Sequence, residues 1–401
     1  MSRQVKQWAF ITACVALTVT AMTFAIRAGM LSQLSLVLQL TDSQLGWVNA
    51  MAFFGFPVAT IVGGALYKVL GAKRLLMIAF IGHILGLLCT LFASGFYSLM
   101  FATFLIGLAN GAVEAGCNPM VTQLFPGKQT TMLNRFHVWF PGGIVLGALV
   151  SISMTYLGLG WQSQFACLLV PTLLYGALLI RLPDNFTEEQ TPANSQRPAL
   201  KALFSPLFLF MLLCMTLTAS TELLTQQWIE RILRESGASA MLTLALITGV
   251  MAVGRYFAGP VIKQLNPLGV LLMSSVTAYL GIRFMAIAQG TEVYYAAIIF
   301  ALGVTYFWPT MLGFVSEKLP RTGALGLGVM GAAGMLAVSI WNPVIGQLIE
   351  REQAPGTQNA FDTLVALSYF PLSLIVAFGL LLLGSFYKAR RQTPKEVCHD
   401  S

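Results

Sequence analysis

Glu114 and Asn118 interrupt an otherwise apolar stretch between Ile106 and Pro126. They are four residues apart, so a helix would place both side chains on one face, one turn from each other. An ionisable group at membrane depth costs at least about 2.5 kcal/mol and is tolerated mainly where it faces protein or water. We interpret Glu114 as a proton-coupling group and Asn118 as a substrate ligand. A protonated glutamate that bonds a neighbouring helix is the alternative.

A second set of polar residues begins at Glu222, with Gln226 one turn later and Gln227 and Trp228 beside it. A carboxylate and two amides can hydrogen-bond several hydroxyl groups, and an indole ring can stack on the apolar face of a sugar. Glu222 is thus a candidate for proton coupling and substrate binding, and the three residues near it are candidate substrate ligands. Trp228 could equally anchor its helix at a membrane interface.

Arg27 interrupts the first apolar segment of the chain. Its fixed positive charge could bind an anionic substrate, or it could neutralise Glu222 on another helix. The sequence leaves both possibilities open. Arg255 and Arg283 could also bind substrate, but we interpret them as packed between helices or extended to a membrane interface.

Weaker substrate-binding candidates lie in other apolar segments. Tyr306 and Trp308 could form an aromatic wall, while His137 and Asn342 could reach the edge of a cavity. A histidine titrates near neutral pH, although a lone histidine in an apolar segment is more often a packed hydrogen-bonding group.

The composition predicts a membrane protein with many spanning helices. Of the 401 residues, 57% are hydrophobic and 9% are charged, and the mean hydropathy is +0.76. A soluble domain would need a more polar surface. The net charge of +8 does not indicate a nucleic-acid partner, because the basic residues form no patch with stacking aromatic side chains. The six cysteines include no CxxC pair, which favours neither a disulfide framework nor a metal site.

Apolar runs long enough to cross a bilayer, about 20 residues each, number twelve. They lie near residues 8–38, 43–69, 73–94, 97–125, 131–158, 161–182, 206–233, 238–265, 268–288, 292–319, 322–349 and 362–387. The fold class is therefore an all-α membrane protein. We expect residues 1–182 to form a six-helix bundle, 183–205 a cytoplasmic linker, and 206–401 a second bundle with a basic tail.

Basic residues set the predicted orientation. Those in the connections on one side, and at both ends of the chain, include Arg3, Lys6, Lys68, Lys73, Arg74, Lys128, Lys201, Lys263, Lys318 and Lys388. An excess of Lys and Arg marks cytoplasmic loops. Both termini are therefore expected in the cytoplasm, with the chain in a bacterial inner membrane.

An internal repeat supports the division into two halves. Gly64–Lys68 reads GALYK and Gly259–Lys263 reads GPVIK, at an offset of 195 residues. The same offset relates Arg27 to Glu222. Parallel repeats with a site at their interface are one known plan for secondary transporters.

The stretch from Gly64 to Arg74, GALYKVLGAKR, resembles the signature GxLaDrxGrk of the major facilitator superfamily. It departs from that signature at Lys68 and Val69, where an aspartate and an arginine are usual. Lys68, Arg74 and Lys263 are candidate gating residues on this resemblance. Two further regions are similar to the fucose permease group of sugar–proton symporters: Glu114–Pro119, and the segments Phe307–Thr310, Gly328–Gly331 and Pro343–Gly346. The resemblance implies that the first, fourth, seventh and tenth helices line a central cavity.

The sequence contains no GxSxG motif, phosphate-binding loop or His/Cys cluster with metal spacing, so an enzyme is not expected. We expect a monomeric secondary transporter that imports a sugar or sugar derivative, without a cofactor, driven by protons; sodium is not excluded. Three alternatives stay open: a carrier of organic anions that uses Arg27, an exporter of drugs or metabolites, and a membrane sensor that binds a solute without transporting it.

Overall fold

The computed structural model describes residues 2–183, 200–233, 236–352 and 361–392. Every regular element in these ranges is a helix, and ten helices are long and apolar enough to cross a membrane. One of the ten, with 50 residues, contains two helices that meet at a kink, and Ala240–Tyr256 is a shorter apolar helix. These elements agree with the twelve predicted spans.

The first six spans comprise eight helices. They are α1 (Arg3–Gly29), α2 (Leu31–Leu38), α3 (Asp42–Leu91), α4 (Phe96–Leu124), α5 (Gln129–Phe136), α6 (Trp139–Tyr156), α7 (Trp161–Ala166) and α8 (Leu169–Ile180). The second six follow residues 184–199, which lie outside the described ranges. They comprise α9 (Leu200–Leu203), α10 (Pro206–Gln227), α11 (Ile229–Ile232), α12 (Ala240–Tyr256), α13 (Ala258–Met285), α14 (Glu292–Val304), α15 (Phe307–Lys318), η2 (Pro320–Thr322), α16 (Gly323–Glu352) and α17 (Phe361–Gln392). The domain boundaries at 182 and 206 remain a prediction.

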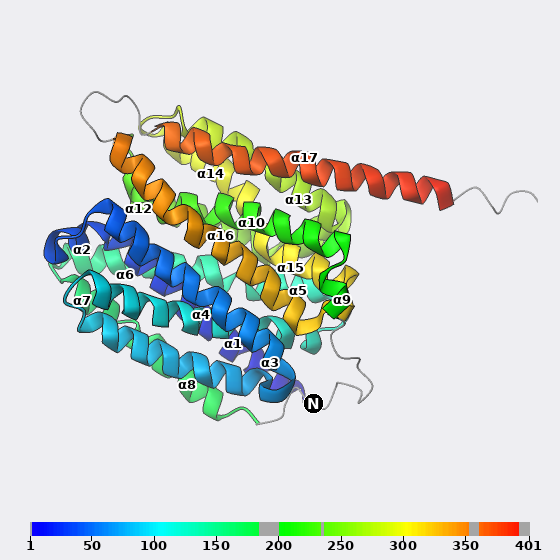
Figure 1. The fold of residues 1–401 in the computed structure, drawn as a ribbon, viewed down its shortest axis with the longest axis horizontal. Coiled ribbons are helices and arrows are strands. Elements are labelled where there is room, and N and C mark those ends of the chain that lie inside the picture. The colour runs from blue at the N-terminus through cyan, green and yellow to red at the C-terminus, as the bar shows by residue number, and fades with distance from the viewer. Residues whose placement is uncertain (1, 184–199, 234–235, 353–360, 393–401) are drawn as a thin grey trace, which may run out of the picture.

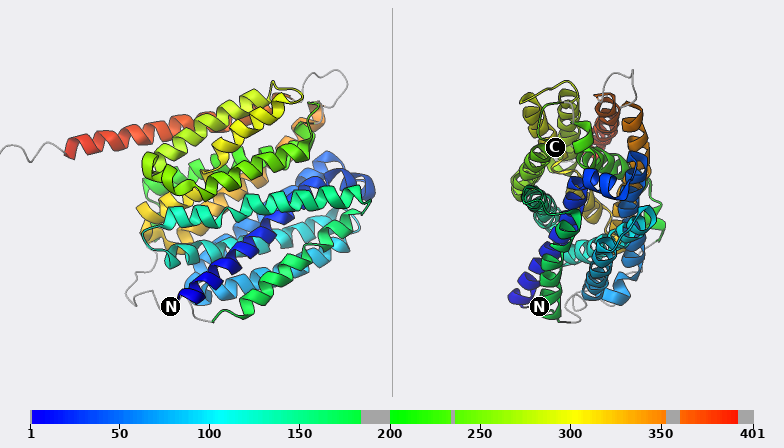
Figure 2. Two further views of the ribbon diagram at one scale, coloured as in Figure 1. Left: turned by 180° about the vertical axis from the view of Figure 1, so that it is seen from behind. Right: turned by 90° about the vertical axis from the view of Figure 1, so that its left-hand side faces the viewer.

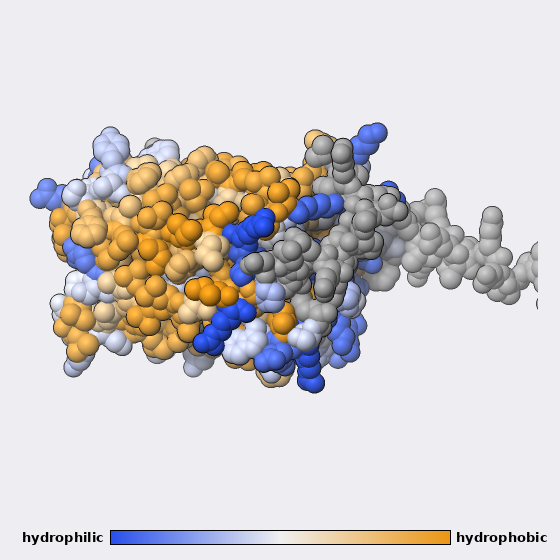
Figure 3. Space-filling model, turned by 90° about the horizontal axis from the view of Figure 1, so that it is seen from below, coloured by the Kyte–Doolittle hydropathy of each residue, from blue (hydrophilic) through white to orange (hydrophobic). Residues whose placement is uncertain are grey.

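The helices of the two halves lie side by side. In Figure 1 those of the first half, blue to teal, fill the lower part, and those of the second half fill the upper part. Figure 2 shows the same grouping from two further directions. The halves meet mainly where α3 packs against α16 and α6 against α12. Hydrophobic residues cover the middle of the face in Figure 3, as a protein surrounded by lipid requires, and hydrophilic residues gather towards the end where the amino terminus lies.

The backbone repeats at the same offset as the sequence. Within α3 the helical geometry breaks at Gly71 (φ 69°), and within α13 it breaks at Asn266 (φ 55°), 195 residues later. Glycine and asparagine are the residues that adopt positive φ most readily. The Asn266 side-chain oxygen also accepts hydrogen bonds from the backbone N–H groups of Leu268 and Gly269, which caps the helix that follows. The two connections are therefore structurally equivalent turns.

A buried chain of hydrogen bonds joins four helices of the first half. Tyr175 on α8 donates to Nδ1 of His83 (2.8 Å), and Nε2 of His83 donates to the side-chain oxygen of Asn110 on α4 (2.8 Å). The Asn110 amide donates to Thr23 on α1 (3.2 Å). This arrangement fits a neutral imidazole with its proton on Nε2. Since Thr23 and Asn110 lie one turn before Arg27 and Glu114, the chain fixes the relative register of the helices that carry both charges.

The two halves are in contact at both ends. On the face opposite the amino terminus, Arg231 pairs with Asp42 at 2.8 Å. On the face where the amino terminus lies, Glu317 accepts hydrogen bonds from the backbone N–H (3.2 Å) and the hydroxyl group of Thr130. We call these contacts the far latch (Asp42–Arg231) and the near latch (Thr130–Glu317). Both contacts are formed, so the two halves touch near each end of the molecule.

We expect His83→Phe to lower the thermal stability of the purified protein. The substitution retains a ring but leaves the Tyr175 hydroxyl and the Asn110 carbonyl without their partner, at a cost of about 1–3 kcal/mol. The midpoint of thermal unfolding, followed by intrinsic fluorescence, should fall by several degrees. Tyr97→Phe, at a side chain that is 82% exposed, serves as the control and should leave the midpoint unchanged. Equal stability of His83→Phe and the wild type would show that these hydrogen bonds do not stabilise the fold.

We expect Glu317→Ala to open the near face. The substitution removes both hydrogen bonds of the near latch, so the modification rate of a cysteine placed at Leu327, in a background without other cysteines, should rise about two- to tenfold. The rate is measured with a membrane-impermeant thiol reagent applied from that face. Arg231→Gln, which breaks the far latch instead, should raise the rate only from the other face. The interpretation of these contacts as latches is wrong if both variants change access equally from both sides.

Candidate functional site

Glu114, Asn118 and His137 form one polar cluster in the first half. The Asn118 amide donates a hydrogen bond to the carboxylate of Glu114. Nε2 of His137 lies 3.1 Å from the Asn118 side-chain oxygen and 3.8 Å from Oε2 of Glu114. All three side chains are at most 5% exposed. The spacing argument is confirmed for Glu114 and Asn118, which lie on one face of α4.

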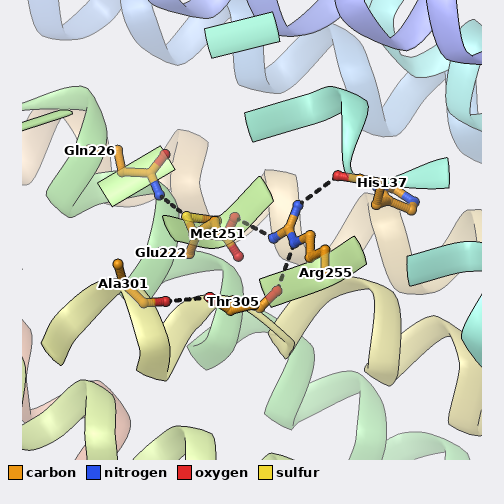
Figure 4. A network of polar contacts seen from close by, with 7 residues as sticks. All are labelled: His137, Glu222, Gln226, Met251, Arg255, Ala301 and Thr305. Carbon is orange, nitrogen blue, oxygen red and sulfur yellow. Dashed lines mark hydrogen bonds and ion pairs between the residues drawn. The ribbon is translucent and has the colours of Figure 1, made fainter. Parts of the chain in front are cut away.

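Glu222 and Arg255 form an ion pair in the second half. Nη2 of Arg255 on α12 lies 3.0 Å from Oε1 of Glu222 on α10, and both side chains are buried. Figure 4 shows the guanidinium group between Glu222 and two backbone carbonyls, those of Thr305 and His137. Glu222 is therefore neutralised by Arg255, and the alternative that Arg27 neutralises it is wrong for this structure.

Arg27 is buried beside aromatic rings and has no acidic partner among the described residues. Its Nε donates to the side-chain oxygen of Asn49 on α3 (3.1 Å), while one of its terminal nitrogens has no hydrogen-bond partner. The guanidinium carbon lies 5.1 Å from the centroid of the Phe24 ring and 5.9 Å from that of Phe53. These distances are typical of cation–π contacts. The charge is thus held by a neutral amide and two aromatic faces.

A narrow pocket, here the phenylalanine pocket, lies between the halves. Arg27 is not among the residues that line it, but the Phe24 and Phe53 rings, which contact Arg27, are. About 310 Å³ of space free of protein atoms lies here, part of it open to solvent, and the pocket is lined by Phe24, Ala25, Ala28, Phe53, Phe140, Ile144, Leu223, Gln226, Gln227 and Leu244. Eight of these ten side chains are apolar. The Gln226 amide nitrogen contacts Met251, but the Gln226 side-chain oxygen and the Gln227 side-chain nitrogen have no partner. The pocket therefore offers an apolar wall with two unsatisfied amide atoms.

A second space, the glutamate pocket, lies towards the near face. About 230 Å³ of space free of protein atoms, part of it open to solvent, lies here between α3, α4 and α16, lined by Thr60, Glu114, Ala115, Asn118, Pro119, Ala324, Leu327, Gly328 and Gly331. Gln226 and Gln227 thus line one pocket and Glu114 and Asn118 line another, rather than one shared chamber, and Arg27 and Glu222 line neither of the two. The Glu114 carboxyl group borders this second pocket.

The remaining predicted substrate ligands pack against protein. The Trp228 indole nitrogen donates to the Asn342 side-chain oxygen (2.9 Å), and both side chains are fully buried, so Trp228 lies at no membrane interface. The Tyr306 hydroxyl donates to the Gly254 carbonyl (3.1 Å). The Trp308 ring lies edge-on to Phe56, and its indole nitrogen has no partner. A role for these residues in binding remains a prediction.

The predicted gating residues Lys68, Arg74 and Lys263 are exposed. Arg74 donates to the Val69 carbonyl within its own segment (3.4 Å). The contact between the halves near this face is instead the near latch. A gating role for the three basic residues stays a prediction.

The sequence analysis did not identify Arg255 as the partner of Glu222, nor Phe24 and Phe53 as the rings beside Arg27. Arg255 lies in an apolar span, as Arg27 does, and its position inside the membrane was the available signal. It is indeed packed between helices, as predicted, but it is also the partner of a candidate site residue. Phe24 and Phe53 gave no signal, since phenylalanine is common throughout such spans.

A model of the Major Facilitator Superfamily matches residues 9–342. The 3-(3-hydroxy-phenyl)propionate transporter of Escherichia coli (strain K12) is 28% identical over 268 residues, which cover 63% of this chain and 63% of that protein. The hexuronate transporter of Bacillus subtilis (strain 168) is 26% identical over 171 residues, 42% of this chain and 39% of that protein. The chain thus matches less than two thirds of the length of either relative.

Among solved structures, the proton:xylose symporter XylE, bound to 6-bromo-6-deoxy-D-glucose, superposes with a TM-score of 0.74 at 14% sequence identity, covering 94% of this chain and 95% of that one. This similarity shows the fold. The match to the family model over most of the chain shows more: the chain belongs to the Major Facilitator Superfamily, whose members are transporters and not enzymes.

Proposed function

We propose that this transporter carries small organic anions with an apolar or aromatic body, and that Arg27 binds their carboxylate group. The observation that carries the proposal is the buried Arg27 side chain, which has no acidic partner in the part of the chain that the structure describes, and one of whose terminal nitrogens is buried there without a hydrogen-bond partner. A guanidinium group presents donors in a planar fork that matches a carboxylate. An incoming carboxylate would therefore find an unused binding group at membrane depth.

The phenylalanine pocket supports an apolar body for the solute. Three phenylalanine rings line it, and the Phe24 and Phe53 rings are 5.1 Å apart. The free amide atoms of Gln226 and Gln227 could bond one or two hydroxyl groups. The names of two relatives, a hydroxyphenylpropionate transporter and a hexuronate transporter, both describe carboxylates. An aromatic carboxylate that bears a hydroxyl group fits these features best.

A sugar is the second candidate substrate, supported by the two free amide atoms. A neutral sugar presents hydroxyl groups on nearly every carbon, and each hydroxyl buried without a partner costs about 1–3 kcal/mol. Eight apolar side chains around the pocket leave most of these hydroxyls unpaired. The pocket therefore favours the anion over the sugar.

Charge balance supports coupling to protons. Among the described residues, the buried Asp, Glu, Lys and Arg side chains are Arg27, Arg255, Glu114 and Glu222. Their formal charges, two positive and two negative, cancel. A bound anion adds one negative charge in a low-dielectric site, where an uncompensated charge is costly. A proton on Glu114 would restore neutrality, because that carboxylate accepts a hydrogen bond from an amide and lies 3.8 Å from a histidine, and has no guanidinium partner among the described residues. We propose symport of one proton with each anion, in a monomer whose termini lie in the cytoplasm of a bacterium.

Arg27→Gln should reduce uptake of 3-phenylpropionate into proteoliposomes by about ten- to a hundredfold, since a charge-assisted hydrogen bond contributes about 1.5–3 kcal/mol. Arg27→Lys retains the charge without the planar fork and should give an intermediate rate. D-xylose uptake, measured in parallel, tests the sugar alternative. The proposed function is wrong if the protein takes up xylose and no carboxylate, and if Arg27→Gln retains part of the xylose uptake.

Glu114→Gln should uncouple transport from the proton gradient, because the amide imitates a permanently protonated carboxyl group. Exchange of labelled for unlabelled 3-phenylpropionate should continue in this variant, whereas accumulation driven by a pH gradient should disappear. Accumulation in the wild type is measured with a pH gradient and with a sodium gradient. Dependence on sodium alone would rule out proton symport.

A further inference from the structure

Arg255 satisfies backbone groups at two helix breaks. The tenth span is interrupted between α14, which ends at Val304, and α15, which begins at Phe307. The fifth span is interrupted between α5, which ends at Phe136, and α6, which begins at Trp139. Carbonyl groups at such interruptions lack their full set of helical partners. Nε of Arg255 donates to the Thr305 carbonyl (2.6 Å), and Nη1 donates to the His137 carbonyl (3.1 Å).

Only one of the three contacts of Arg255 crosses between the halves. Thr305 and Glu222 belong to the second half with Arg255, whereas His137 belongs to the first half (Figure 4). A rotation that separates the halves at this level must break the bond to His137 and leave the other two intact. Glu222 then keeps the guanidinium group neutralised and oriented. Arg255 is thus built as one side of a contact that forms only on closure.

His137 lies between Arg255 and Glu114, the buried acid of the first half. Its backbone carbonyl accepts from Arg255, while its ring lies within 3.8 Å of Glu114 and bonds Asn118. The carbonyl of this residue therefore contacts Arg255, the partner of Glu222, while its ring adjoins Glu114. Since His137 sits at the α5–α6 interruption, a shift of this short connection moves its ring and its carbonyl together.

We propose that Arg255 is a positioning residue that holds the two halves closed at the level of the substrate, by joining the helix break of the first half to that of the second. Its role requires three donors in fixed directions, which only a guanidinium group provides. The ion pair with Glu222 orients the group and is not itself the closing contact. The inference rests on the chain being a transporter, and not on which solute it carries.

Four variants separate closure from mere charge pairing. Arg255→Lys keeps the charge but cannot reach three acceptors. Arg255→Gln leaves Glu222 without its partner, and Arg255→Gln/Glu222→Gln removes both charges. Arg283→Gln is the matched control, because Arg283 is exposed on α13. Spin labels at Lys128→Cys and Lys318→Cys, exposed residues at the ends of α5 and α15, report the distance between the halves without any substrate.

We expect Arg255→Lys and the double variant to unfold at nearly the wild-type temperature, yet to show a broader and longer distance distribution and at least tenfold slower exchange of 3-phenylpropionate. Arg255→Gln should lose stability as well as closure, and Arg283→Gln should match the wild type. Recovery of both closure and exchange in the double variant would overturn the proposal and reduce Arg255 to an ion-pair partner. If no variant and no wild type exchanges the carboxylate, the proposed substrate is wrong, and the distances still decide the role of Arg255.

Discussion

The low dielectric of the membrane interior requires every buried charge to be balanced, and the placement of polar groups follows from this constraint. Arg255 and Glu222 balance each other directly at 3.0 Å. Glu114 and Arg27 have no such partner: one is bonded to an amide and adjoins a histidine, and the other is bonded to an amide between two aromatic rings. A charge without a counter-ion is costly, which is why we propose Glu114 as the group that takes up a proton and Arg27 as the group that binds an anion.

The neutral hydrogen bonds of the first half serve the same constraint. The chain from Tyr175 through His83 and Asn110 to Thr23 satisfies polar groups that would otherwise be buried without partners. Its last two members, Asn110 and Thr23, lie one helical turn before Glu114 and Arg27. Charges that lack a counter-ion are therefore held in position by a rigid neutral network, which allows them to bind a ligand without first rearranging.

Contacts within one helix could be predicted from the sequence, whereas contacts between helices or between the two halves could not. Glu114 and Asn118 were placed correctly because a helix converts a spacing of four residues into one face. The Gly71 and Asn266 turns follow from a repeat that is visible along the chain. The pairing of Glu222 with Arg255 joins two helices, and the contact of Arg255 with His137 joins two halves; no spacing encodes either. The two latches, formed by Asp42 with Arg231 and Thr130 with Glu317, depend on how the halves are rotated, which sequence patterns do not specify.

The unsatisfied atoms around the phenylalanine pocket bear on how transport proceeds. Among the described residues, one Arg27 nitrogen, the Gln226 oxygen and the Gln227 nitrogen are buried without partners. Each such group costs about 1–3 kcal/mol relative to its hydrated state, so the empty protein is destabilised when the halves close over it. A carboxylate with a hydroxyl group would provide the missing partners and remove much of that cost. A ligand shifts a conformational equilibrium by the difference between its affinities for the two states. The same atoms that bind the solute would thereby make closure depend on its presence.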